Sequence, residues 1–162
     1  FDSMKYLFYL LRHKFWVFFF CARYGLVWRG ITHDCDKLRP SMFFVYVRNF
    51  SLAEKARDKS GHYNPNDVPA DCRRVLLRHF HHSRHHWQYW LLSCDTAIKP
   101  LDMGETDVRE MLCDWAGAGR AQRGKNWKHA DVRNFYATNR DKMVLSAKTV
   151  ELIEKNLDSM GF

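Results

Sequence analysis

The stretch Gly30-Ile31-Thr32-His33-Asp34-Cys35-Asp36-Lys37 places an imidazole and a carboxylate on consecutive residues. Both side chains are common ligands of divalent metal ions, and two of them in one short segment can hold one ion. A His-Asp dipeptide also arises by chance. The rest of the chain therefore decides whether this pair is a metal anchor around which a domain folds.

The first half of the chain around this pair has a helical pattern. Apolar residues recur at helical spacing over residues 4–24, and Gly25 supplies a C-terminal stop. We expect a short helix over 26–33, and Pro40 suits the first turn of a helix that carries Met42 to Phe50. Residues 58–70 contain Gly, two Pro and two Asn, which predicts the main loop.

The second half is also expected to be helical. A second long helix is predicted from Ala70 to about Leu92, and Pro100 to Gly104 breaks the chain. A helix follows over Asp107 to Ala116, and two closing helices are predicted over 126–139 and 146–159. We detect no β-hairpin signal and no repeat. The sequence predicts an all-α protein, a single compact helical domain over residues 1–162 with about six to seven helices.

Composition limits the class of partner. The chain has 162 residues, the size of one ordinary domain, and a formal net charge of +8, which favours an anionic partner. The basic residues are scattered and form no known nucleic-acid motif, so nucleic acid is possible but not favoured. The apolar run over 6–22 is interrupted by Arg12, His13 and Lys14. It therefore predicts a buried helix, with no membrane association.

The cysteines indicate the compartment. There are five, an odd number, at positions 21, 35, 72, 94 and 113, and none forms a CxxC pair. This pattern fits neither a disulfide framework nor a zinc ribbon, so we expect a cytoplasmic protein whose cysteines are small buried apolar residues.

A histidine-rich segment, Arg78-His79-Phe80-His81-His82-Ser83-Arg84-His85-His86-Trp87, follows the main loop. On a regular helix His79, His82 and His86 share one face, while His81 and His85 form a separate pair. Burying several imidazoles without a shared cation is costly, so the segment favours a metal site. The pattern favours His86 over His85 as a ligand only if the helix stays regular.

Two isolated polar residues complete the candidate set. His13 lies in the middle of the first helix among aromatic residues, and Asp114 interrupts the apolar run Met111-Leu112-Cys113-Asp114-Trp115. Each of them alone is also compatible with a buried core residue whose polar atoms are hydrogen-bonded. A buried carboxylate, however, needs a cation or several donors.

The order His, His-Asp, His, His, Asp resembles that of the HD-domain superfamily of metal-dependent phosphohydrolases, which are all-helical. The chain is more closely similar to DUF5662, a small uncharacterised family of bacteria and phages, from which it departs at Asp36 (usually Ser) and at His82-Ser83 (usually Arg-Asn). The matching stretches are Leu11-Arg12-His13-Lys14, residues 25–37, His85-His86-Trp87-Gln88-Tyr89-Trp90, residues 111–115 and Asn139-Arg140-Asp141-Lys142-Met143.

The HD resemblance implies a set of metal ligands. His13, His33, Asp34 and Asp114 would hold one ion, and Asp34 would bridge to a second ion held by His79 and His86. The cofactors would be one or two divalent transition metals: Fe, Mn, Zn, Co or Ni. Lys37 resembles the lysine of HDxxK motifs that faces the substrate phosphate.

Roles for other residues follow from their chemistry and position. We expect catalytic roles for Asp34, Lys37 and His85. Lys37, Arg84, Arg140 and Lys142 are candidates for binding substrate charge, together with His82. Trp87 and Trp115 would either stack on a nucleobase or, as the simpler interpretation, pack around the metal ligands.

The expected function is a metal-dependent phosphohydrolase that acts on a nucleotide or another small phosphate ester through a metal-activated water. One alternative is a di-iron oxygenase of the HD type, which uses the same ligands. The other is a non-catalytic basic module that binds nucleic acid or a partner, for which a steep salt dependence is expected.

Overall fold

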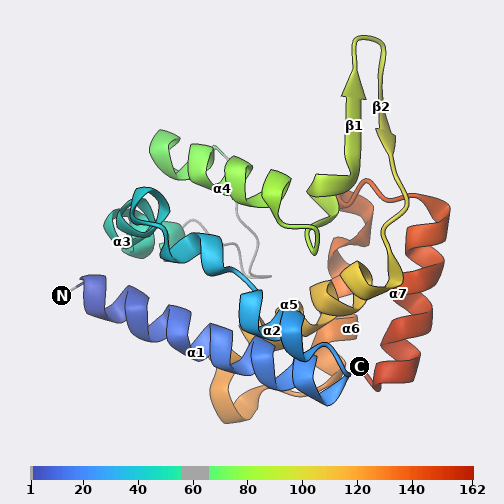
Figure 1. Ribbon diagram of the computed structural model, residues 1–162, viewed down its shortest axis with the longest axis horizontal. Coiled ribbons are helices and arrows are strands. Elements are labelled where there is room, and N and C mark those ends of the chain that lie inside the picture. Colours follow the sequence, from blue (N-terminus) through green and yellow to red (C-terminus); the bar gives the residue numbers. More distant parts are fainter. Residues whose placement is uncertain (1, 56–65) are drawn as a thin grey trace.

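The structure is a computed structural model that describes residues 2–55 and 66–162 (Figure 1). These residues form seven α-helices, which confirms the all-α prediction: α1 (Asp2–Arg23), α2 (Val27–Thr32), α3 (Pro40–Lys55), α4 (Ala70–His82), α5 (Glu105–Arg123), α6 (Ala130–Asn139) and α7 (Ala147–Met160). Four short 3₁₀ helices and one hairpin connect them: η1 (Cys35–Leu38), η2 (Trp87–Trp90), η3 (Gly124–Asn126), η4 (Arg140–Lys142), β1 (Leu91–Cys94) and β2 (Ala97–Pro100).

The central packing is that of α1 against α5. Gly117 of α5 lies directly against Val17 of α1, and a Cβ added at Gly117 would stand 2.4 Å from the Val17 Cγ2 atom and 2.8 Å from its backbone nitrogen. Only glycine allows two helix backbones to approach this closely. Val17 lies one turn after His13, and Gly117 lies one turn after Asp114. The close approach therefore brings these two polar residues face to face.

The helix α2 is held against α1 in a similar way. A Cβ added at Gly30 would stand 2.9 Å from the Cys21 Cβ atom and 3.0 Å from the Phe18 Cα atom. Because Gly30 is buried against α1, the residues that follow it, His33 and Asp34, enter the interior beside the middle of α1. The predicted short helix over 26–33 is confirmed, with His33 as its C-terminal cap.

The apolar core lies on the other side of these helices. It is built from buried residues of α1, α5, α6 and α7, among them Phe20, Met111, Leu112, Ile153 and Leu157. In Figure 1, α6 and α7 lie beside α5, whereas α3 and α4 lie on the opposite side, near the N-terminal half of α1. The polar residues of interest thus lie between the apolar core and the layer formed by α3 and α4.

The prediction of one long helix from Ala70 to Leu92 is wrong. The helix α4 begins at Ala70 as expected but ends at His82, and Ser83 takes an extended conformation. In a continuous helix His79 and His86 would be separated by about 10.5 Å along the axis. In the structure their Nε2 atoms are 2.9 Å apart, because the chain turns back after Ser83.

The prediction that the chain has no β-hairpin is also wrong. The strands β1 and β2 pair antiparallel, with Leu91 opposite Pro100 and Cys94 opposite Ala97, and they project from the helical body in Figure 1. The two-residue connection Asp95-Thr96 lacks the Asn-Gly or Asp-Gly signal that marks tight hairpins, and the strands are mostly exposed.

Smaller differences concern element ends and cysteines. The helix α5 continues seven residues beyond the predicted Ala116, to Arg123, and α6 begins at Ala130 rather than at 126. Of the predicted loop over 58–70, residues 58–65 lie outside the described residues.

The expectation that the cysteines are buried is only partly right. Cys21, Cys72 and Cys113 are buried, whereas Cys35 and Cys94 are exposed. Within the described residues, no helix has the length and apolar character to cross a membrane.

The α1–α5 approach yields a first prediction. Gly117→Ala should destabilise the protein by about 1–3 kcal/mol, since the added methyl overlaps α1, and it should lower bound metal because His13 and Asp114 separate. Chemical denaturation and metal analysis measure the two effects. Gly119→Ala on the same helix is the control, because its Cβ meets the Trp127 ring instead. Equal metal content in the two variants would contradict the positioning role of Gly117.

Candidate metal centre

Five segments of the chain bring the predicted ligands, and His85 beside them, to one place. His13 comes from the middle of α1, His33 and Asp34 follow α2, and His79 comes from the last turn of α4. His85 and His86 lie in the turn before η2, and Asp114 lies on α5. Five of these residues are buried: His13, His33, Asp34, His79 and His85.

The backbone at Asp34 is unusual. Asp34 has φ 55° and ψ 21°, and it is the only non-glycine residue with positive φ among the described residues. Aspartate tolerates the left-handed region better than most residues, but the conformation still has an energetic cost. This turn directs the carboxylate into the interior between α2 and η1.

The first ligand group consists of His13, His33, Asp34 and Asp114. The His13 Nε2 atom is 3.4 Å from Asp34 Oδ2 and 3.3 Å from Asp114 Oδ1. The His33 Nε2 atom is 3.5 Å from Asp34 Oδ1 and 3.3 Å from Asp114 Oδ1. Two ligands that each lie about 2.0–2.2 Å from one ion are separated by about 3.0–3.5 Å. The spacing therefore suits a shared metal ion.

The second ligand group consists of Asp34, His79, His85 and His86. The Asp34 Oδ1 atom is 3.3 Å from His79 Nε2 and 3.5 Å from His85 Nε2. The His86 Nε2 atom points at His79 Nε2. Asp34 thus belongs to both groups, with Oδ2 toward His13 and Oδ1 toward the histidines of the second group. The geometry brings together every predicted ligand and adds His85 to the set.

The buried donor atoms fit a metal better than they fit each other. Among the described residues, the buried atoms without a hydrogen-bond partner include His33 Nε2, Asp34 Oδ1 and His85 Nε2, all at the junction of the two groups. Leaving such atoms unpaired costs roughly 1–3 kcal/mol each. A divalent cation would satisfy both kinds of atom at once, because imidazole nitrogens and carboxylate oxygens are common ligands of such ions.

A second layer of carboxylates orients the imidazoles. The Nδ1 atoms of His33 and His85 are 3.0 Å and 3.2 Å from Glu110 Oε1, and His79 Nδ1 is 2.7 Å from Asp36 Oδ2. Metal-ligating histidines usually donate their other N–H to such a group, which leaves the opposite nitrogen for the metal. Here the opposite nitrogen is Nε2 in all three residues, and it faces Asp34 each time.

The carboxylate of Glu110 is itself anchored. Arg29 Nη1 donates to Glu110 Oε2 at 2.8 Å and to Asp107 Oδ1 at 2.6 Å. Burial raises the pKa of Glu110, but hydrogen bonds from His33 and His85 outweigh burial and lower the pKa below its usual range. Glu110 therefore stays ionised, as its orienting role requires.

Electrostatics divide the histidines into two kinds. Burial lowers the pKa of His33, but the charge of Asp34 and hydrogen bonds to Asp114 and Glu110 outweigh burial and raise it to about 10. Burial and the neighbouring His85 and His79 hold the pKa of His86 well below its usual value. His86 is thus neutral and ready to coordinate, whereas a metal bound by His33 must displace a proton.

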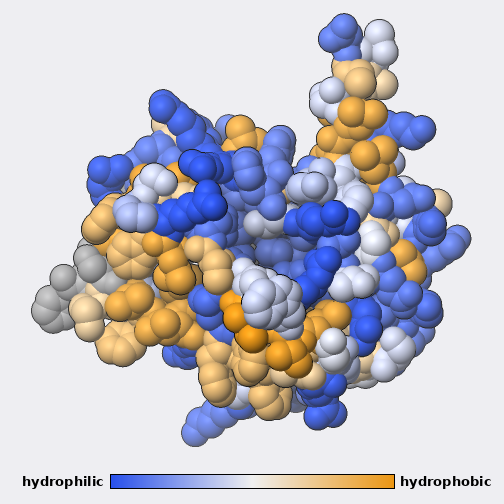
Figure 2. Space-filling model, in the orientation of Figure 1, coloured by the Kyte–Doolittle hydropathy of each residue, from blue (hydrophilic) through white to orange (hydrophobic). Residues whose placement is uncertain are grey.

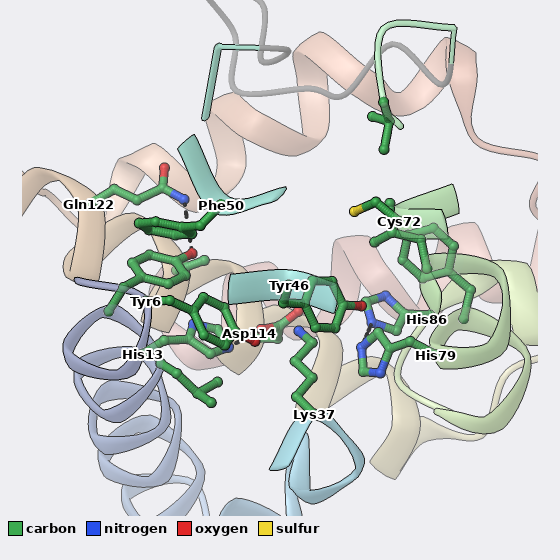
Figure 3. Close-up of a pocket in the computed structure, with 16 residues that line it drawn as sticks. Tyr6, His13, Lys37, Tyr46, Phe50, Cys72, His79, His86, Asp114 and Gln122 are labelled. Atoms are coloured by element: carbon green, nitrogen blue, oxygen red, sulfur yellow. Dashed lines mark hydrogen bonds and ion pairs between the residues drawn. The ribbon is translucent and has the colours of Figure 1, made fainter. Parts of the chain in front are cut away.

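A cavity of about 470 Å³ opens onto the cluster, and Figure 3 shows the residues around it. His13, His79, His86 and Asp114 reach its surface together with Lys37. Lys37 Nζ lies 2.6 Å from Asp34 Oδ2, and the carboxylates hold its pKa above the usual value despite burial, which lowers it. Lys37 therefore lies beside the candidate metal ligands and lines the cavity.

A second, more polar depression of about 480 Å³ approaches the cluster beside His33, His85 and Glu110. The predicted substrate residues His82 and Arg84 line this depression. His82 is exposed, and its Nδ1 contacts the Arg78 carbonyl, so the expectation that it shares an inner face with His79 is wrong. The chain turns back after Ser83, so that His86 rather than His82 lies beside His79. His81 is exposed and does not pair with His85.

Four other predicted substrate residues line neither cavity. Trp87 and Trp115 are partly buried against the apolar core, and Trp115 packs on Phe135. Arg140 and Lys142 lie in η4, on the surface.

Sequence reasoning missed Glu110, which orients two ligands, and the contact of Asp36 with His79. Glu110 lies four residues before Asp114, so helical spacing places both on one face of α5. That spacing was the available signal. Asp36 carried no signal beyond its place next to the His-Asp pair.

The comparisons with known proteins agree with this reading of the chain at the level of the family. Residues 2–159 match the family described as "Family of unknown function (DUF5662)". The chain belongs to this family. No curated protein matches, and no solved structure matches.

The second layer yields a second prediction. Glu110→Gln should weaken metal binding about 10- to 100-fold, because two ligand imidazoles lose the carboxylate that orients them. Titration against a coloured chelator measures the affinity. Asp107→Asn is the matched control, since it also breaks an Arg29 ion pair but contacts no ligand histidine in the described structure. If both variants bind metal alike, Glu110 acts only as a partner of Arg29.

Proposed function

We propose that this protein is a metal-dependent hydrolase of phosphoric ester bonds, related to the HD-domain phosphohydrolases and acting in the cytoplasm on a small phosphorylated molecule. The observation that carries the proposal is the shared position of Asp34. One carboxylate joins two histidine-rich ligand groups beside an open cavity, and a lysine ammonium reaches the same carboxylate from the cavity side.

The ligand set suits one or two divalent ions such as Fe, Mn, Zn, Co or Ni, because imidazole and carboxylate donors match these metals. When bound, such ions activate water near neutral pH and offset the negative charge of a phosphoryl group. His13, His33 and Asp114 would hold the first ion, and His79, His85 and His86 the second. Asp34 would bridge them.

Lys37 is the residue proposed to bind the phosphoryl group. Its ammonium group lines the cavity. Among the described residues, no other Lys or Arg side chain lines it. A substrate phosphate that approaches the metals from the cavity would come within reach of this donor. Contact with Asp34 keeps Lys37 protonated and fixed in place.

A second candidate is a di-iron oxygenase with the same ligands. It is favoured by the excess of imidazoles, since five histidines and only two carboxylates form the two groups. Iron content, visible colour and oxygen-dependent turnover would distinguish this chemistry from hydrolysis. The remaining alternative, a basic module that binds nucleic acid, gives the buried cluster no role and predicts binding that weakens steeply with salt.

The third prediction tests the hydrolase. A metal-loaded sample should release phosphate from phosphomonoesters, and Lys37→Met should lower kcat/KM about 100-fold or more, the usual cost of one transition-state donor, at unchanged metal content. Lys142→Met is the matched control and should retain full activity because Lys142 lies away from the cavity. If the metal-loaded protein hydrolyses no ester of a broad panel but consumes oxygen, the hydrolase proposal is wrong and the oxygenase takes its place.

A further inference from the structure

The cavity beside the cluster has two chemically different parts. Its walls are mainly aromatic and apolar, with Tyr6 and Tyr9 from α1, Tyr46 and Phe50 from α3, and Phe80 from α4. Its charged and imidazole groups lie together around Lys37 and the candidate metal ligands, whereas Gln122 lies apart from them and donates to the Tyr9 hydroxyl at 3.4 Å, as Figure 3 shows. Apolar walls with a few convergent polar groups are the usual form of a small-molecule site.

Tyr46 supplies an unused polar atom in this cavity. Its hydroxyl is buried and has no hydrogen-bond partner among the described residues. Burial raises its pKa above the ordinary value, so the hydroxyl keeps its proton and can donate. The ring of Tyr46 stacks on that of Tyr6 with centroids 5.9 Å apart, which fixes its orientation. A buried donor without a partner points to a ligand that completes it.

We propose that the cavity binds a molecule with a single anionic group attached to a flat aromatic or apolar body. This rests on the proposed function for the identity of the anionic group as a phosphate. The anion contacts Lys37 and the metal ions, Tyr46 donates a hydrogen bond to the same end, and the body packs against the tyrosine and phenylalanine rings. Polyphosphates are disfavoured, because Lys37 is the only Lys or Arg of the described lining.

The test uses phosphonates, which cannot be hydrolysed as esters, so binding is measured apart from turnover. Calorimetry on the metal-loaded protein should show 1-naphthylphosphonate binding at least tenfold more tightly than methylphosphonate, and tripolyphosphate more weakly than 1-naphthylphosphonate. Equal affinity for the two phosphonates, or tighter binding of tripolyphosphate, would overturn the proposal. Tight naphthylphosphonate binding without hydrolysis of any ester would support it and reject the hydrolase.

Two variants assign the contacts. Phe50→Ala should weaken 1-naphthylphosphonate at least fivefold and leave methylphosphonate unchanged, since only the aromatic body reaches the ring. Tyr46→Phe should weaken both phosphonates at least threefold at unchanged metal content. Tyr89→Phe is the control, because Tyr89 lies outside the cavity. If Tyr46→Phe binds both ligands like the unchanged protein, its hydroxyl is not part of the site.

A separate observation concerns the outer face of α1. Five apolar side chains lie on this face with spacings of four, three, four and three residues: Met4, Phe8, Leu11, Phe15 and Phe18. Their exposed fractions run from 38% to 65%. Figure 2 shows apolar surface gathered over this part of the molecule. We call these five residues the α1 stripe.

The spacing of the α1 stripe is that of a helix–helix contact. A repeat of 3.5 residues keeps side chains aligned along a partner helix, whereas contact with a lipid surface needs no such repeat. The inner face of α1 already packs against α5, and at its C-terminal end Phe18 borders Gly30 of α2. The side chains of Met4, Phe8, Leu11 and Phe15 remain more than half exposed among the described residues. The stripe's α1 neighbours Lys5 and Arg12 are exposed and fit the solvated rim of an interface.

The exposed area matches that of a dimer interface. The stripe is continued by Phe19 on α1 and by Val27, Trp28 and Ile31 on the adjoining α2, of which Trp28 is 73% exposed. If each of these nine side chains buries roughly 100 Å², half of what an aromatic residue can bury, the surface is about 900 Å². A standard interface buries about 800 Å² per partner, and the largest apolar patch of a monomer is about 300–600 Å².

We infer that the α1 stripe packs against the same stripe of a second copy of this chain. A two-fold axis uses one patch twice, so no other surface is required. The metal cluster lies on the opposite side of α1, where His13 projects inward. Each copy therefore keeps a complete metal centre.

Light scattering coupled to size exclusion tests this pairing. The unchanged protein should be a dimer at micromolar concentration, and Phe15→Glu should be a monomer with the same far-ultraviolet spectrum and metal content. Ile98→Glu on the hairpin is the control for an exposed apolar residue and should remain dimeric. An unchanged protein that is monomeric, whether free or bound to vesicles containing phosphatidylserine, would overturn the inference.

Discussion

The rest of the structure depends on how the buried carboxylate of Asp34 is surrounded. Its two oxygens face different partners, His13 and Lys37 on one side and three histidines on the other. A charged group buried this deeply is stable only if several cations or donors surround it. The turn at Asp34 with positive φ accepts local strain to place it there.

The packing of the helices makes that centre possible. Gly117 and Gly30 let α5 and α2 approach α1 so closely that candidate ligands from three helical segments lie within about hydrogen-bonding range of one another. The helix α4 ends after His82, which lets the next turn carry His85 and His86 back to His79. The end of α4 gives up regular helix for the placement of these side chains, a common sign that a site rather than the core dictates the local fold.

Much of this was predictable from the sequence. Helical periodicity located α1, α2 and the start of α4, and the order of His and Asp residues selected six candidate ligands that the structure brings together. The break at Ser83 was not predictable, because the segment favours a helix locally and only the tertiary contacts of His85 and His86 oppose it. Glu110 escaped notice because a glutamate on a helix is ordinarily solvated, and only its contact with two imidazoles reveals its role.

The most direct test is a crystal structure of the protein loaded with Mn²⁺, with diffraction recorded to maximise the anomalous signal of manganese. The shared-carboxylate arrangement predicts two anomalous peaks about 3.5–4 Å apart. One peak should lie among His13, His33 and Asp114, the other among His79, His85 and His86, with Asp34 between them. A structure with full-occupancy metal elsewhere, and hydrogen bonds alone around Asp34, would contradict this assignment.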